Sequence, residues 1–488
     1  MQAYQDLMAH QRQTQALAQI SGRLGWDQET MMPQGAAAQR AEESAALQTV
    51  IHARRTDPCV GDWLAALSGA DLPPEAAANI RHIQRDWDKA RRLPADLVAA
   101  LARQTSLSQQ AWAQCKTDEN VAGFLPFLTD IITLKQQEAA ALQTPGQSPY
   151  DALIDDYEPM MRADDLAQMF AALRPRLADL RARLKDRSRA PMLQGHFPKA
   201  AQLELSQRLA LAFGYDLTRG RIDLAVHPFS SGSGTDVRIT TRVDEADPFN
   251  CLYSTIHEVG HACYEQNIIA DYALTPLGQG VSMGVHESQS RIYENQLGRS
   301  RAFCNYLYRE MTARFGDMGL SGADEFYAAV NALRNGYIRT EADEVQYNLH
   351  VLLRFDLERA LFEGDLSPAD LEAAWNDRFA ADFGFAVDRP SHGLLQDVHW
   401  SCGLFGYFAT YSLGNLYAGS LHKALRAHLP DLDSDLERGH LTGATDWLAQ
   451  RVQRFGGLKS PHDTITQACG FAPDATHLLD YLEEKFTG

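Results

Sequence analysis

The chain has 488 residues, of which 45% are hydrophobic and 22% charged, as in an ordinary globular protein. A formal net charge of −18, with no evident basic patch, argues against nucleic-acid binding. The first twenty residues lack an apolar signal-peptide core, and no run of eighteen apolar residues occurs, so no membrane span is expected. The seven cysteines are scattered without a CxxC pair, which favours reduced thiols and a cytoplasmic location.

Helical periodicity dominates the chain and predicts a mainly α fold. Apolar residues recur at helical spacing over 36–54, 166–189, 343–363, 369–383 and 478–486. Pro175 lies near the middle of the second of these ranges and predicts a kink there. The intervening Pro- and Gly-containing stretches are short, so we expect no disordered linker between helices.

One stretch departs from the helical pattern. Residues 221–229 alternate apolar and polar side chains, and residues 237–243 do the same. The Gly- and Ser-rich segment 230–234 separates these two runs. This arrangement predicts a β-hairpin with its turn in the Gly/Ser segment.

The segment His257-Glu258-Val259-Gly260-His261 follows on the next predicted helix. Asp247 can cap that helix and Pro248 can occupy its first turn, and we expect it to run to about residue 266. Spacing of four residues places the two imidazoles on one helical face, with Glu258 beside the first. Two such histidines can hold zinc, and the glutamate can act as a general base for an attacking water. The pattern therefore indicates metal-assisted hydrolysis, most often of peptides. Cys263, on another face, is expected to be a small buried hydrophobe.

A catalytic zinc needs a third protein ligand, and Glu287 is our choice for it. We expect this residue to open a second helix that ends near Gly298. The rivals are Glu265, which lies too close along the first helix, and Glu294, further along the second. Glu294 and Arg291 fall on the same side as Glu287, where they can support the ligands instead. The plain alternative for Glu287 is a carboxylate at a helix start, beside a surface His286.

Other short motifs occur besides the HExxH segment, and one of them contains Glu287. They are Trp26 to Pro33 (WDQETMMP), His227-Pro228-Phe229, Asp236 to Thr240 (DVRIT), His286 to Gln289 (HESQ), Ile338 to Asp343 (IRTEAD) and Gly393 to Trp400 (GLLQDVHW). Together with the HExxH segment they resemble the motifs of the carboxypeptidase Taq family, in the same order. The resemblance covers essentially the whole chain.

The resemblance implies a fold, a cofactor and a reaction. It implies a large, mainly α-helical molecule with a deep substrate groove, and usually a homodimer. The predicted β element at 221–243 would lie beside the active site. We expect one peptidase domain over 1–488, in which 1–200 form one groove wall and 201–488 carry the metal site. The ligands carry over to His257, His261 and Glu287, and the acid/base to Glu258. Members release C-terminal residues from peptides with one divalent metal, zinc here, which cobalt can replace.

Further residues match motif positions that handle substrate. Arg238 and Arg339 are both candidates to grip the free C-terminal carboxylate, and the choice between them stays open. His227 and Gln396 are expected to contact substrate. The 221–243 hairpin could pair with the peptide through an edge strand.

Two residues near the end of the motif region are expected to act in catalysis. Tyr411 lies where the family places a tyrosine near the metal, and can donate to the developing oxyanion, with Tyr407 as the alternative. His399 is expected to contact substrate, or else to pack beside Trp400.

Two functions other than that of a zinc carboxypeptidase are compatible with parts of this pattern. A zinc oligoendopeptidase would use the same chemistry in a related helical groove, but would tolerate an amidated C-terminus. A non-catalytic helical binding protein would be expected to have lost the ligands or Glu258, and all four residues are present.

Overall fold

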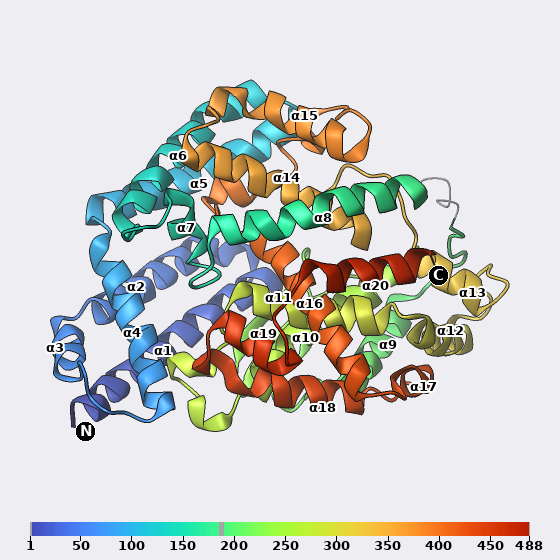
Figure 1. The fold of residues 1–488 in the computed structure, drawn as a ribbon, viewed down its shortest axis with the longest axis horizontal. Helices are drawn as coiled ribbons and strands as arrows, with labels where there is room; N and C mark the ends of the chain where they lie inside the picture. Colours follow the sequence, from blue (N-terminus) through green and yellow to red (C-terminus); the bar gives the residue numbers. More distant parts are fainter. Residues whose placement is uncertain (1, 185–189, 488) are drawn as a thin grey trace.

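The computed structural model describes residues 2–184 and 190–487, which are mostly helical (Figure 1). The helices before the sheet are α1 (Gln2–Thr30), α2 (Ala37–Arg55), α3 (Pro58–Ala66), α4 (Pro74–Arg92), α5 (Ala95–Thr117), α6 (Val121–Leu142), α7 (Pro149–Ile154), α8 (Ala163–Leu184) and α9 (Lys199–Ala212). Those after it are α10 (Pro248–Asn267), α11 (Met283–Arg291), α12 (Arg301–Phe315), α13 (Ala323–Val330), α14 (Glu344–Glu363), α15 (Leu371–Phe383), α16 (Ala409–His428), α17 (Leu432–Glu437), α18 (Thr442–Arg451), α19 (Pro461–Cys469) and α20 (Ala475–Thr487).

Short helical turns connect the longer elements. The 3₁₀ turns are η1 (Gln34–Ala36), η3 (Ala270–Tyr272), η4 (Pro276–Gly278), η6 (Arg339–Glu341), η7 (Pro368–Asp370), η8 (Pro390–His392), η9 (His399–Cys402) and η10 (Gln453–Leu458). The π-helix η5 (Ile292–Gly298) continues α11. In Figure 1, α10, α11 and α16 lie in the middle of the molecule, with α14 and α15 above them and α1 to α4 at one side.

The helices expected from periodicity are present at close to their predicted limits. The ranges 36–54, 343–363, 369–383 and 478–486 appear as α2, α14, α15 and α20. The range 166–184 lies in α8, which also contains Pro175, whereas 185–189 fall outside the described residues.

The sheet differs from the predicted hairpin. β1 (Ile222–Leu224) pairs in parallel with β3 (Asp236–Thr241), so these two runs do not form a hairpin with each other. The Gly/Ser segment expected to be their turn is itself a strand, β2 (Ser230–Ser233), antiparallel to β3. Gly232 makes this pairing possible, because a Cβ there would lie 2.0 Å from the backbone oxygen of Asp236. The sheet order is therefore β1-β3-β2, with β3 in the centre.

Two hydrophobic cores are present among the described residues. A small one between α1, α3 and α4 consists of Leu7, Met8, Val60, Leu64, Leu67 and Ile83. A large one contains buried side chains of α5 to α9, the sheet and the helices from α10 onward. Helices α5 to α8 therefore share a core with the C-terminal half. The single peptidase domain over 1–488, with 1–200 as one groove wall and 201–488 carrying the metal site, stays a prediction.

The cysteines and the lengths of the apolar helices bear on two expectations from the sequence. All seven cysteines are free thiols, and Cys263 is fully buried as predicted. Within residues 2–184 and 190–487, no helix combines the length and apolar character that crossing a membrane requires.

Candidate metal centre

The two histidines of the HExxH segment lie on one face of α10. Asp247 caps this helix by accepting a hydrogen bond from the backbone N–H of Phe249, and Pro248 follows it in the first turn. The ring centroids of His257 and His261 are 5.0 Å apart, as expected for side chains one turn apart. The local sequence therefore determines this half of the centre.

Two glycines allow the neighbouring helices to approach α10 closely. A Cβ at Gly260 would lie 2.5 Å from the backbone oxygen of Gln289 in α11. A Cβ at Gly414 in α16 would lie 2.6 Å from the Cβ of Glu287. Real Cβ atoms do not come this close, so both positions require glycine for the packing observed. The two contacts bring Glu287 against the histidine face of α10.

Glu287 is the carboxylate that meets both histidines. Its Oε2 lies 3.8 Å from Nε2 of His257 and 3.4 Å from Nε2 of His261. One ligand atom from each of the three residues can be chosen so that all lie within 4.8 Å of one another. The predicted triad is thus brought together in space.

The triad fits a divalent metal by its geometry and its donor atoms. Ligands about 2.0–2.1 Å from a tetrahedral zinc are about 3.3 Å apart, close to the two Nε2–Oε2 separations. Two imidazoles with one carboxylate leave the fourth position open for water or substrate, as in catalytic sites. The same donors suit cobalt and manganese, so the donor set alone does not select the metal.

Glu287 does not begin its helix as predicted. Ser282 caps α11 by accepting a hydrogen bond from the N–H of Val285, so the helix begins at Met283. The buried carboxylate of Glu158 also accepts a hydrogen bond from the N–H of Gly284. This second cap comes from a distant part of the chain, and local sequence could not reveal it. The helix continues through η5 and ends at Gly298, as expected.

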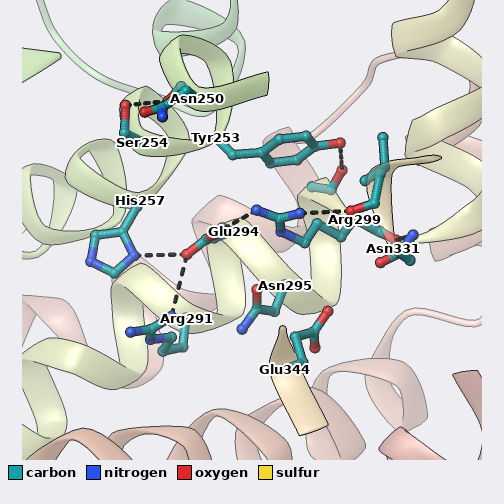
Figure 2. Close-up of polar contacts among 12 residues, drawn as sticks. Asn250, Tyr253, Ser254, His257, Arg291, Glu294, Asn295, Arg299, Asn331 and Glu344 are labelled. Carbon is teal, nitrogen blue, oxygen red and sulfur yellow. Dashed lines mark hydrogen bonds and ion pairs between the residues drawn. The ribbon is translucent and has the colours of Figure 1, made fainter. Parts of the chain in front are cut away.

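Glu294, a rival for the third ligand, supports His257 from the outside instead. Its Oε2 lies 2.9 Å from Nδ1 of His257, the nitrogen that faces away from the triad (Figure 2). Its Oε1 accepts a hydrogen bond of 2.9 Å from Arg299, and Arg291 lies 3.6 Å from Oε2. A carboxylate on the far nitrogen fixes the ring and the tautomer that leaves Nε2 free.

Glu265, the other rival, also lies outside the triad. Its Oε1 is 3.1 Å from Nε2 of His286, and Nδ1 of His286 lies 2.6 Å from Nδ1 of His261. His286 is therefore not the surface residue of the plain alternative, because its ring contacts a candidate ligand.

Glu258 is buried on α10 beside His257, with 6% of its surface exposed. Burial raises the pKa of Glu258 to about 7, and the negative charges of Glu287 and Glu294 add to the effect, although His257 opposes it. A carboxyl group with a pKa near neutrality can both accept and return a proton at physiological pH. These are the properties that a general base in peptide hydrolysis needs.

Two of the candidate ligands, His261 and Glu287, are held in their ligating protonation states. Burial lowers the pKa of His261 to about 3, which keeps its imidazole neutral. Burial disfavours the Glu287 carboxylate, but Arg291 and the two imidazoles outweigh it and hold the pKa of Glu287 below its ordinary value. The Nε of Arg291 donates a hydrogen bond of 2.6 Å to Oε1 of Glu287.

A second polar cluster consists of Arg339, Arg354 and Asp397. Arg339 donates to Oδ1 of Asp397 from Nε and Nη2, at 3.2 and 3.0 Å. Arg354 donates to Oδ2 from Nε at 2.7 Å and is fully buried. Burial opposes ionisation of Asp397, but Arg354 and then Arg339 lower its pKa below the ordinary value. Two guanidinium groups therefore share one carboxylate, which leaves an excess of positive charge.

Tyr347 links this arginine cluster to the metal centre. Its hydroxyl accepts a hydrogen bond of 3.1 Å from Nη1 of Arg339. Its ring stacks under the guanidinium of Arg291, 4.4 Å from the centroid. Because Arg291 also bonds Glu287, three successive contacts join a candidate ligand to Arg339.

Tyr411 and His399 lie together beside Arg339. Nε2 of His399 is 3.4 Å from the hydroxyl of Tyr411, and the guanidinium of Arg339 lies 5.0 Å from the Tyr411 ring. Burial, followed by the nearby Tyr407, raises the pKa of Tyr411, so its hydroxyl keeps its proton. Burial lowers the pKa of His399 to about 4, and Arg339 and Arg354 act in the same direction, although Asp397 opposes them. Both groups are therefore neutral near pH 7.

The remaining residues predicted to contact substrate lie in two places, beside Arg339 and in the sheet region. Gln396 is buried, and its Oε1 accepts a hydrogen bond from the backbone N–H of Arg339 at 3.0 Å, so it holds that residue in place. Arg238 lies on β3, bonds Asp236 at 2.7 Å and stacks on Trp26 of α1 at 4.3 Å. His227 is exposed between β1 and β2. The two candidate arginines thus sit in different surroundings.

Sequence reasoning assigned no role to Arg354, Asp397 or Tyr347. A signal for the first was present, because Gln346, His350, Arg354 and Glu358 follow one another at four-residue spacing in α14. All are buried, so the Leu-rich helix carries a polar stripe inside the protein. A buried arginine in such a stripe indicates an acidic partner on another element.

Comparisons with known proteins agree with these observations. The family model of the carboxypeptidase Taq (M32) metallopeptidases matches residues 6–486. The chain is 41% identical to thermostable carboxypeptidase 1 of Thermus thermophilus, over 99% of its own length and 98% of that protein. It is 34% identical to carboxypeptidase 1 of Bacillus subtilis, over 95% and 93%.

Solved structures have the same fold. The M32 carboxypeptidase of Deinococcus radiodurans matches with a TM-score of 0.94 at 38% identity, covering 100% of this chain and 99% of that one. Metallocarboxypeptidase 1 of Trypanosoma cruzi matches with a TM-score of 0.97 at 32% identity, covering 100% of both chains. The resemblance drawn from the sequence motifs and the mainly helical fold are both confirmed. The chain therefore belongs to the carboxypeptidase Taq (M32) family of metallopeptidases and is a peptide hydrolase of the metallocarboxypeptidase class.

Proposed function

We propose that the protein removes C-terminal residues from peptides with one zinc ion held by His257, His261 and Glu287. The observation that carries this assignment is the convergence of the two Nε2 atoms on Oε2 of Glu287, at 3.8 and 3.4 Å. A divalent metal there would polarise the scissile carbonyl and acidify the attacking water. Zinc suits these nitrogen and oxygen donors, and cobalt can replace it.

Glu258 acts as the general acid/base of the reaction. It takes a proton from the attacking water, and then delivers this proton to the nitrogen of the departing amino acid. Its burial supports the role, because a pKa raised to about 7 makes both transfers favourable near neutral pH.

Tyr411 and His399 act on the reacting carbonyl through its oxygen. The Tyr411 hydroxyl donates a hydrogen bond to the oxygen that gains negative charge as water attacks. His399, neutral and 3.4 Å from that hydroxyl, orients it and contacts the substrate. Tyr407 packs edge-on against Tyr411, with centroids 5.3 Å apart, and restricts its ring.

Arg339 binds the C-terminal carboxylate of the substrate. Two arginines around one aspartate leave positive charge unbalanced, and Arg339 lies against Tyr411. A substrate carboxylate would restore the balance, which favours peptides with a free C-terminus. Gln396 supports this grip through the backbone of Arg339.

Arg238 and His227 contact the peptide further from the scissile bond. Both belong to the sheet region, where β2 is an outer strand to which an extended peptide can add. The Arg238 charge is already paired with Asp236, so it is less suited than Arg339 to bind the terminal carboxylate.

The protein acts in the cytoplasm as a homodimer. Seven free cysteines suit a reducing compartment, and the family resemblance supports the dimer. Cell fractionation tests the location. Analytical ultracentrifugation of the zinc-loaded protein tests the assembly, and a monomer at micromolar concentration would contradict it.

The experiment that tests the activity uses one peptide with two different ends. The zinc-loaded protein is incubated with the free-acid and the C-terminally amidated forms, and products are read by mass spectrometry over time. We expect stepwise loss of single residues from the free-acid form and little turnover of the amide. Internal cleavage of both forms would show an endopeptidase instead.

A further inference from the structure

The two candidate ligand histidines are supported in different ways on their outward nitrogens. His257 meets the carboxylate of Glu294 directly, at 2.9 Å (Figure 2). His261 meets another imidazole, because its Nδ1 lies 2.6 Å from Nδ1 of His286. A contact of this length between two imidazole nitrogens is a hydrogen bond in which one ring must donate and the other accept.

Beyond His286 lies a second buried carboxylate. Oε1 of Glu265 is 3.1 Å from Nε2 of His286 and accepts a hydrogen bond of 2.9 Å from the backbone N–H of Gly280. Glu265 has 7% of its surface exposed. The chain of contacts therefore runs from His261 through His286 to Glu265, and the backbone of Gly280 holds its far end.

The contacts in this chain suit one direction of hydrogen bonding, from His261 toward Glu265. Oε1 of Glu265 already accepts a hydrogen bond from the N–H of Gly280, so it is placed to accept a second one from Nε2–H of His286. In the tautomer with its proton on Nε2, His286 presents a lone pair on Nδ1 and accepts there from Nδ1–H of His261. His261 is thereby left with its lone pair on Nε2, the nitrogen that faces Glu287. The opposite direction would put a proton on Nε2 and block ligation.

The space around His286 is shaped to its ring. A Cβ at Gly280 would lie 2.7 Å from Cδ2 of His286 and 3.0 Å from the ring of Tyr264. The Tyr264 and His286 ring centroids are 5.2 Å apart. Any side chain at position 280 would therefore displace the imidazole from its place between His261 and Glu265.

We propose that His286 and Glu265 are positioning residues that select the metal-binding tautomer of His261. The inference rests on the proposed metal site, and deepens it by giving each ligand histidine its own acidic support. Partners of this kind are typically responsible for about 10- to 100-fold of metal affinity. Neither residue contacts the substrate in this role.

Glu265 is the better residue to change, because its hydrogen bonds go to His286 and Gly280 rather than to a ligand. Glu265→Leu removes the acceptor, while the matched Glu265→Gln keeps an oxygen that can accept from His286. The zinc Kd of each protein is measured by competition with a chromogenic chelator at fixed pH. We expect Glu265→Leu to raise Kd by about 10- to 100-fold and Glu265→Gln to recover most of that loss.

A second pair of variants tests His286 itself. His286→Phe fills the same space without an acceptor, whereas His286→Asn keeps an oxygen at the position of Nδ1. Phe should weaken zinc binding and shift the visible spectrum of the cobalt-loaded protein, and Asn should do so much less. If the Phe variant does not fold, Gly280→Ala takes its place as the test. It displaces the imidazole without removing it, and should also weaken zinc binding.

The outcomes separate this inference from the proposed metal site. If the unaltered protein does not bind zinc, the site itself is wrong. If it binds zinc and Glu265→Leu binds it within about twofold as tightly, the relay is wrong. Equal losses in His286→Phe and His286→Asn would also overturn the relay, because they would show that packing and not the acceptor matters.

Discussion

The metal centre and the arginine cluster are two buried polar groups with opposite charge imbalances. In the metal centre, the carboxylates of Glu258, Glu287 and Glu294 surround the histidines and face two guanidinium groups, Arg291 and Arg299. In the arginine cluster, Arg339 and Arg354 share the single carboxylate of Asp397. The contacts of Tyr347 with Arg291 and Arg339 join the two groups.

The difference indicates what each group is built to receive. An excess of buried carboxylate is costly until a cation joins it, and an excess of guanidinium until an anion does. The first suits a divalent metal and the second suits a peptide carboxylate.

The largest effect should follow from removing Glu287, the candidate anionic ligand of the metal centre. We expect Glu287→Ala to purify with little zinc and to lose activity almost completely, because two histidines alone hold zinc weakly. Elemental analysis and peptide turnover measure this. Full zinc occupancy in the variant would remove Glu287 from the ligand set. Chelator treatment of the unaltered protein should give the same loss, and added zinc should reverse it.

Glu258→Gln should still bind the metal but should hydrolyse peptides much more slowly. The amide is nearly the same size but cannot take a proton, so kcat should fall by about 10²- to 10⁴-fold with zinc content unchanged. Parallel kinetics and elemental analysis separate this variant from Glu287→Ala. Turnover close to that of the unaltered protein would contradict the general-base role.

Changes at the arginine cluster should affect substrate selection rather than metal binding. Arg339→Ala should raise KM for free-acid peptides by about 10- to 100-fold, the usual range for a lost charged hydrogen bond. It should leave the zinc Kd unchanged. The amidated peptide, which has no carboxylate to lose, serves as the control substrate.

Arg238→Ala provides the comparison between the two arginines. Because Arg238 is paired with Asp236 and stacked on Trp26, its loss should weaken the binding of free-acid and amidated peptides to the same extent. A selective loss for the free-acid peptide in this variant, with none in Arg339→Ala, would move the carboxylate grip to the sheet.

The smallest effect concerns the pH dependence of stability. Burial lowers the pKa of His399 to about 4, below its unfolded value of about 6.5. The stability from neutral His399 is therefore present above pH 6.5 and is lost as pH falls through 4. Relative to His399→Asn, the unaltered protein should lose at most about 1.4 kcal/mol per pH unit over this interval. Urea unfolding at several pH values measures this, and parallel pH curves for the two proteins would contradict it.

Sequence reasoning did best where the chemistry lies within one helix. Four-residue spacing put His257 and His261 on one face of α10, and Asp247 with Pro248 marked where that helix begins. It was wrong about the sheet, because the Gly/Ser segment that reads as a turn pairs as β2. Strand pairing depends on partners elsewhere in the chain, and short alternating runs do not specify them.

By itself the sequence determined the family, the helical fold and the pair of candidate metal-ligand histidines, because ordered motifs and helical periodicity are local properties. Only the tertiary structure decided how Glu287, Glu294 and Glu265 divide their roles. All three are acidic residues at plausible spacing, and they differ in which nitrogen of which histidine they meet. The tertiary structure also decided the partners of Arg339 and Arg238, because an arginine's neighbours come from elements far away in the chain.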